Sequence, residues 1–261
     1  MQETLTSAEP GSDVVALGYG ITAVLMVALP LARHLAGKRL GEPEAARRRA
    51  TRMTAVGVSL YVAIMGALAA SGVLGHWDRV PPSFLLGILL ALVVTVLAAR
   101  SSFGLRLAEG LPLAWLVGFQ GFRIPVELML HRAAEQGVIG GQMTWSGFNF
   151  DVVSGIVGVG LGVWLWRRGE AAPPPRAVLW AYNLLGLGLL TTIVGISVLS
   201  MPTPFRRFEG PPNVFVATVP FVWLPTVMVM AALLGHLLLF RRLARGRSLA
   251  ASKREAAEKA V

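Results

Sequence analysis

The chain has 261 residues, of which 54% are hydrophobic and only 15% are charged. A soluble domain usually carries about 25% charged residues, so this composition excludes an ordinary soluble protein. Apolar runs of about 18 residues or more recur along the chain, and each is long enough to cross a bilayer. The chain has no cysteine, which excludes disulfides, thiolate metal sites and a cysteine nucleophile. The sequence therefore predicts an all-α, multi-pass membrane protein.

Seven apolar segments are predicted to span the membrane. They are roughly residues 14–35, 53–75, 83–99, 111–131, 148–166, 177–199 and 215–240. We expect an acidic tail of residues 1–13 before this bundle of residues 14–242, and a basic tail of residues 243–261 after it. The acidic tail lacks the basic segment with which a signal peptide begins, so we expect none.

Lysine and arginine are distributed unevenly among the predicted connections. The first, third and fifth connections and the C-terminal tail hold seven, two, three and seven of the 24 basic residues. The opposite side holds only Arg79, Arg132, Arg206 and Arg207. The positive-inside rule then places the N-terminus outside and the C-terminus in the cytoplasm, across the inner membrane of a bacterium. This distribution accounts for the net charge of +10 without nucleic-acid binding.

The fourth predicted span, residues 111–131, carries a polar stripe inside an apolar segment. At about 100° per residue, Gln120, Arg123, Glu127 and His131 fall within an arc of roughly 80° on one helix face. A charge near the bilayer centre costs at least about 2.5 kcal/mol, so these side chains should face a protein interior or a wet cavity. Pro125 lies between the two charges and cannot donate to the carbonyl of Gly121, which predicts a kink.

Polar residues of other spans are expected to meet this stripe in the outer half of the bundle. The fifth span enters with polar residues at its outer end, and so does the seventh. We therefore expect a ligand-binding pocket formed by Gln120, Arg123, Glu127, His131, Asn149, Asp151, Asn213, Thr218, Trp223 and Thr226.

Two interpretations of Arg123 and Glu127 fit their spacing. The first is an ion pair within one helix, because residues four apart are neighbours on a helix surface. The second is a site in which Arg123 holds a carboxylate or phosphate while Glu127 exchanges a proton. The two interpretations are compatible, and the first does not require a ligand.

Metal and haem sites have weaker support in the sequence than the solute-binding pocket has. Glu127 and His131 have a spacing that can chelate a metal, with Asp151 as a third ligand, but there is no HExxH motif. A bis-histidine haem needs histidines on facing helices at a suitable depth. The other three histidines lie near predicted span boundaries instead, namely His34, His76 and His236. We therefore expect no cofactor.

Small residues and prolines mark packing faces and helix breaks. Ser154, Gly158 and Gly162 repeat every four residues on the fifth span, and residues 59, 63, 67 and 71 repeat likewise on the second. This spacing favours close helix packing. Pro220 and Pro225 lie in the predicted seventh span, where they indicate either simple kinks or a broken helix of the kind that lines transporter sites.

Several segments resemble an uncharacterised family of small bacterial integral membrane proteins. They are residues 122–127 with His131, residues 142–144 and 149–151, and residues 212–213 with 220–226. The resemblance implies a bacterial membrane protein and no particular activity.

The sequence favours a membrane protein that binds or moves a small polar or acidic solute, or protons, with membrane lipid around it. One alternative is a membrane-embedded enzyme that uses Glu127, His131 and Asp151. A second is an accessory subunit in which the pair of Arg123 and Glu127 serves assembly only.

Overall fold

The computed structural model describes residues 7–169 and 174–258, and these residues form helices and connecting turns without any strand. The elements in chain order are α1 (Ser12–Arg39), α2 (Glu44–Ala70), η1 (Val73–Gly75), α3 (Ser83–Arg100), α4 (Ser102–Gly110), α5 (Leu113–Gly118), η2 (Phe119–Phe122), α6 (Arg123–Glu135), η3 (Gly141–Met143), α7 (Asp151–Arg168), α8 (Arg176–Leu199), η4 (Phe215–Ala217), η5 (Leu224–Met228) and α9 (Val229–Glu258). The all-α prediction is confirmed for this part of the chain.

Six helical segments are long and apolar enough to cross a membrane, which indicates a multi-pass membrane protein. They are residues 12–39, 44–70, 83–100, 113–135, 176–199 and 224–245. The remaining predicted span corresponds to α7, which has 18 residues. Its first turn contains Asp151 and its last turn contains Arg167 and Arg168, so a shorter part of it is free of charge.

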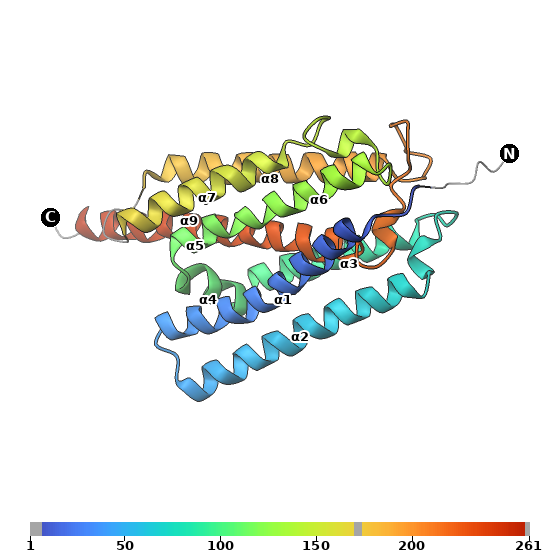
Figure 1. Ribbon diagram of the computed structural model, residues 1–261. Coiled ribbons are helices and arrows are strands. Elements are labelled where there is room, and N and C mark those ends of the chain that lie inside the picture. Colours follow the sequence, from blue (N-terminus) through green and yellow to red (C-terminus); the bar gives the residue numbers. More distant parts are fainter. Residues whose placement is uncertain (1–6, 170–173, 259–261) are drawn as a thin grey trace.

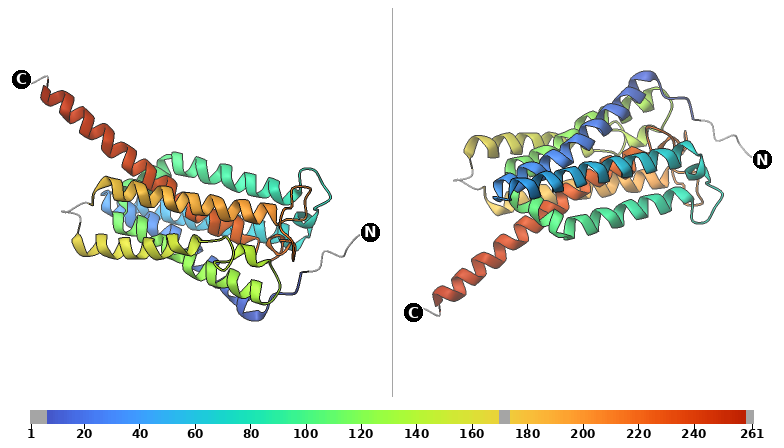
Figure 2. Two further views of the ribbon diagram at one scale, coloured as in Figure 1. Left: turned by 90° about the horizontal axis from the view of Figure 1, so that it is seen from above. Right: turned by 90° about the horizontal axis from the view of Figure 1, so that it is seen from below.

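The long helices lie side by side along one direction, as Figures 1 and 2 show. The first part of α9 lies in the interior and packs on α3, α4, α5 and α8, while its C-terminal part extends beyond the bundle (Figure 2). α2 packs mainly on α1 and forms an edge of the bundle (Figure 1). α7 packs on α5, η2, α6 and α8. The outward face of α3 carries exposed apolar side chains, among them Leu86, Leu90 and Leu97, and such a continuous apolar face suits contact with lipid.

The segment that carries the polar stripe is one path of three helical pieces. α5 tightens into the 3₁₀ turn η2 at Phe119–Phe122, and α6 follows without a loop. Pro125 lies in the first turn of α6. Backbone N–H groups of a first turn have no partner within the helix, so the missing N–H of proline costs no intrahelical hydrogen bond there. The expected irregularity is therefore this 3₁₀ turn just before the proline.

The last span begins later than the sequence suggested. Residues before Leu224 form the short turn η4 and irregular chain, and the helix starts as the π-helical turn η5 before it continues as α9. Pro220 thus lies outside the helix and Pro225 lies in its first turn. The predicted interruption of a span by two prolines is wrong, because both belong to the beginning of the span. Residues 243–258 of the predicted basic tail continue α9 as helix, and residues 259–261 lie outside the described residues.

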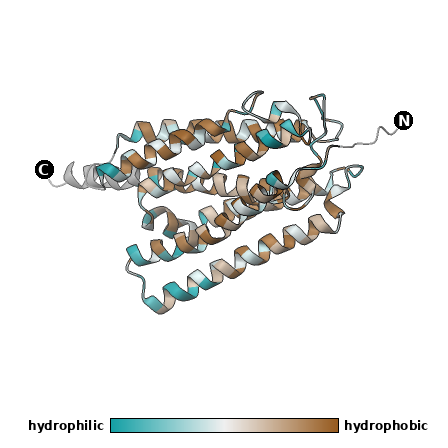
Figure 3. Cartoon of the chain, viewed as in Figure 1, coloured by the Kyte–Doolittle hydropathy of each residue, from teal (hydrophilic) through white to brown (hydrophobic). Residues whose placement is uncertain are grey.

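Basic connections gather at the end of the bundle opposite the N-terminus, where Figure 3 shows hydrophilic residues at the ends of α1 and α2. There Glu42 pairs with Arg33 at 2.9 Å and also with Arg106 of α4. Arg241 of α9 donates to the carbonyls of Ala99 and Ser101 at 2.6 and 2.7 Å. Burial raises the pKa of Glu42, but the hydrogen bonds and charges of Arg33 and Arg106 outweigh burial and hold that pKa below its ordinary value of 4.5.

Candidate functional site

A cluster of buried polar side chains lies where α6, α7, α8 and α9 meet. Each of its members is at most 5% exposed. We call it the Arg123 cluster, and its members are Gln120, Arg123, Glu127, Asn149, Asp151, Ser154, Asn183 and His236. Polar groups are costly to bury unless they are hydrogen-bonded, so their partners decide what the cluster does.

Arg123 makes its ion pair across helices and not within its own helix. Its Nε lies 2.8 Å from Oδ2 of Asp151, the first residue of α7. Its Nη1 donates to Oγ of Ser154 at 2.8 Å, and that hydroxyl lies 3.3 Å from Oδ1 of Asp151. The sequence-based pairing of Arg123 with Glu127 is therefore corrected. A carboxylate in the first turn of a helix, such as that of Asp151, is also favoured by the helix dipole, whereas Glu127 lies past the first turn of α6.

Glu127 has an amide as its hydrogen-bonding partner. Asn149 Nδ2 donates to Glu127 Oε2 at 2.6 Å and also to the carbonyl of Met143 at 3.0 Å. Asn149 Oδ1 accepts from the backbone N–H of Asp151 at 3.1 Å, so Asn149 links the carboxyl group of Glu127 to the backbone at the start of α7. Within the described residues, Glu127 makes no ion pair, and only this one hydrogen bond to its carboxyl is present. The carboxyl group is thus buried beside a neutral donor.

His236 of α9 belongs to the cluster although the sequence placed it at a membrane boundary. Its Nε2 lies 3.3 Å from Arg123 Nη1, and its Nδ1 lies 2.8 Å from Oδ1 of Asn183. Asn183 Nδ2 in turn donates to the backbone carbonyl of His236 at 3.1 Å. Because a guanidinium only donates, Nε2 must accept and Nδ1 must carry the proton, which describes a neutral imidazole. A Cβ on Gly186 would lie 2.5 Å from Cε1 of His236, so the ring needs a glycine there.

The depth of His236 explains why it was missed. The candidate span runs from Leu224 to Arg245, so His236 lies near the middle of that helical segment. The polar residues Asn183 and His236, each inside an otherwise apolar span, were the available indication.

Two polar atoms of the cluster are buried without a hydrogen-bond partner in the described structure. They are Oε1 of Gln120, an acceptor, and Nη2 of Arg123, a donor. The amide nitrogen of Gln120 donates to the carbonyl of Ala232 at 3.0 Å, which fixes the side chain against α9. An unsatisfied buried group costs about 1–3 kcal/mol. A small polar molecule or water with both donor and acceptor atoms would satisfy such groups.

His131 lies outside the cluster. Its ring stacks on Trp145 with centroids 4.2 Å apart, and its Nε2 lies 3.6 Å from a carboxylate oxygen of Glu135. Asp151 is engaged by Arg123 and Glu127 by Asn149, so the structure does not bring Glu127, His131 and Asp151 together as acid, base or ligands. The described residues also contain no group of three or more histidine and acidic side chains placed to hold a metal.

The predicted site residues near the last span are fixed elsewhere. Asn213 donates to the carbonyl and hydroxyl of Ser197 at 3.1 and 2.7 Å. The hydroxyl of Thr218 donates to the carbonyl of Phe215 at 2.7 Å, and this residue is exposed. Trp223 Nε1 donates to the carbonyl of Val62 at 3.0 Å, and the hydroxyl of Thr226 donates to the carbonyl of Val222, just before the helix, at 2.6 Å. Of the ten predicted residues, the cluster contains Gln120, Arg123, Glu127, Asn149 and Asp151.

No family model, curated protein or solved structure matches this chain. The resemblance to a bacterial membrane protein family therefore remains a prediction from the sequence, and the candidate site depends on its own geometry.

Proposed function

We propose that this chain crosses the inner membrane of a bacterium seven times, with the C-terminus in the cytoplasm. The seven spans are the six long apolar segments and α7. The position of α7 beside the spans α6 and α8 supports this count. The distribution of lysine and arginine among the connections supports the orientation.

We further propose that the Arg123 cluster binds and moves a proton together with a small acidic solute. The observation that carries this proposal is the carboxyl group of Glu127, which is buried with a hydrogen bond from Asn149 and makes no ion pair within the described residues. Such a group needs a proton or a bound cation, because an isolated buried carboxylate is very costly. The free Nη2 of Arg123 is a suitable donor for an oxygen of a carboxylate or phosphate.

The test is proton movement into proteoliposomes that contain a pH-sensitive dye, under inward gradients of succinate, citrate or inorganic phosphate. We expect acidification with at least one of these anions. Glu127→Gln, which keeps the shape of the side chain but cannot exchange a proton, should abolish it. Glu135→Gln is the control, because Glu135 lies on the same helix, is half-exposed and contacts Arg132 and His131. Equal flux in wild type and Glu127→Gln would contradict the proposal, and so would no flux with any of the three anions.

A role in assembly alone is the second candidate. It is favoured by the hydrogen bonds and the ion pair that Asp151, Ser154, Asn183 and His236 make across helices. On this interpretation, Glu127→Gln would lower the melting temperature of the protein while wild type itself moved no protons.

A further inference from the structure

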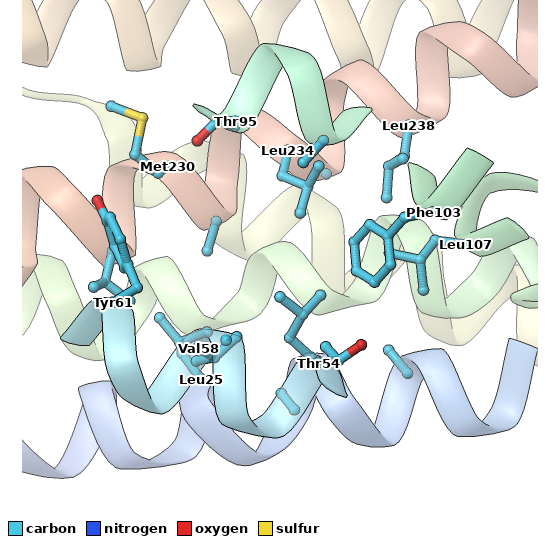
Figure 4. A pocket seen from close by; sticks show the side chains of 18 of the residues that line it. Leu25, Thr54, Val58, Tyr61, Thr95, Phe103, Leu107, Met230, Leu234 and Leu238 are labelled. Atoms are coloured by element: carbon cyan, nitrogen blue, oxygen red, sulfur yellow. The ribbon is translucent and has the colours of Figure 1, made fainter. Parts of the chain in front are cut away.

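An apolar cavity of about 610 Å³ lies between α1, α2, α3, α4 and α9 (Figure 4). Leu25, Val58, Phe103 and Leu234 are among its lining residues. α9 separates it from the Arg123 cluster, because Leu234 faces the cavity while His236, two residues further along the helix, faces the cluster. The cavity is therefore a second feature of the bundle, distinct from the polar site.

The four hydroxyl groups on the cavity wall are all used by the protein itself. Thr54, Thr95 and Thr226 donate to carbonyls four residues earlier, at 2.9, 2.8 and 2.6 Å. The hydroxyl of Tyr61 donates to the carbonyl of Thr226 at 2.8 Å. None of them needs a ligand to complete its hydrogen bond, so the cavity suits an apolar occupant.

The cavity opens sideways, between α2 and α3. α2 packs on α1, and α3 packs on α9 and α4, but the two helices make few contacts with each other. Met53 and Gly57 on α2 and Val94 on α3 line the cavity and are nevertheless exposed. In a membrane, the medium beside these two spans is the acyl-chain region of the bilayer, which fills an apolar opening more readily than water does.

Positive charge surrounds the end of the cavity near the connection between α1 and α2. Arg49 lies one helical turn before Met53 on the same side of α2 and is exposed. Arg47 donates to the backbone carbonyl of Glu42 and keeps a buried Nε without a partner. Arg106, which pairs with Glu42, is separated by only a few residues from Phe103, which lines the cavity. Residues 33–52 contain seven lysine and arginine residues but only two carboxylates, Glu42 and Glu44, which leaves an excess of positive charge.

We propose that this cavity binds one acyl chain of an anionic phospholipid, whose phosphate lies at Arg49 beside the opening. The apolar wall, the sideways opening and the charge at one end match the two parts of such a lipid. Guanidinium groups are well suited to phosphate because they offer paired N–H donors. The proposal is independent of proton movement at Glu127.

Gly57 offers a direct way to fill the cavity. A Cβ at Gly57 would meet nothing within 4 Å, so Gly57→Trp can place its ring in the opening without a backbone clash. Gly160 of α7 is the matched control, since it is also exposed and its Cβ would also meet nothing within 4 Å. Gly57→Leu is a smaller second variant for the case in which the tryptophan prevents folding.

The measurement is native mass spectrometry of the purified, delipidated full chain with added phosphatidylglycerol or phosphatidylcholine. Wild type and Gly160→Trp should retain one phosphatidylglycerol per chain, and Gly57→Trp or Gly57→Leu should bind it at least tenfold more weakly. Arg49→Gln should reduce the preference for phosphatidylglycerol over phosphatidylcholine severalfold. Equal retention by the Gly57 and Gly160 variants would overturn the cavity as the site. An unchanged preference in Arg49→Gln would overturn the position of the phosphate.

Discussion

Arg123 is the residue that ties the polar cluster together, because its guanidinium contacts side chains from two other helices. Nε holds Asp151 of α7, and Nη1 contacts Ser154 of α7 and His236 of α9. An ion pair within α6 would not have joined the charge of Arg123 to α7. The pairing across helices therefore makes the charge of Arg123 part of the tertiary structure, with Glu127 left for other chemistry.

We expect Arg123 and Asp151 to be energetically coupled. Removing one partner of a buried pair leaves an uncompensated charge and costs about 3–5 kcal/mol. Arg123→Ala and Asp151→Ala should each lower the melting temperature in detergent, and the double variant should recover part of the loss. The comparison is the double variant Arg123→Ala with Glu127→Ala. It should recover less of the lost melting temperature than the double variant of Arg123 and Asp151 does. Strictly additive losses for Arg123 and Asp151 would show that the pair does not form.

A second expectation at this scale concerns Glu42 at the basic end of the bundle. The pKa of Glu42 is lower in the folded protein than the ordinary glutamate value of 4.5. The ionised carboxylate therefore stabilises the fold fully at a pH above 4.5. This stabilisation is lost as the pH falls through the lower, folded-state pKa. Glu42→Gln should therefore melt at a lower temperature than wild type at pH 7, and the difference should shrink below about pH 4.5. A difference that stays constant from pH 7 to pH 3.5 would contradict the lowered pKa.

At the scale of the helix, small residues decide how closely α7 approaches its neighbours. Ser154, Gly158 and Gly162 are all buried, so this predicted packing face is confirmed. Residues 59, 63 and 67 of α2 and residue 71, just after it, have the same spacing but are exposed. The spacing shows only that another helix can approach closely. Whether a helix of the same chain packs against that face depends on the fold.

The contrast between Gly162 and Gly160 tests this packing. A Cβ at Gly162 would lie 2.7 Å from Cα of Gly118, and a backbone atom cannot move aside as a flexible side chain can. Gly162→Ala should force α5 and α7 apart and cost about 1–3 kcal/mol of unfolding free energy. Gly160→Ala should be neutral or stabilise by up to about 1 kcal/mol, because alanine favours helix. Equal effects in a detergent unfolding titration would mean that α5 and α7 are not in close contact.

For the molecule as a whole, the sequence predicted accurately which segments are apolar helices. It predicted less accurately how far each helix is shifted along the membrane normal relative to the others. Hydropathy and length identified the bundle, since both are local properties. The depth of Asn149 and Asp151 depends on how the connection between α6 and α7 folds over the cluster, and the depth of His236 depends on where the last helix begins. The apolar cavity could not be predicted because it arises where α2 and α3 do not pack.

The topology of the whole chain can be tested with single cysteines, because the natural sequence has none. We expect Ser71→Cys and Ser146→Cys to react with a membrane-impermeant thiol reagent in intact cells, since both residues are exposed at the end of the bundle opposite the basic connections. Arg49→Cys and Arg167→Cys should react only after the inner membrane is permeabilised, because the positive-inside rule places them in the cytoplasm. Ser146 and Arg167 lie before α7 and at its end, so this pair reports on α7 alone. Labelling of both in intact cells would limit the chain to six spans, and the reverse labelling of all four would invert the orientation.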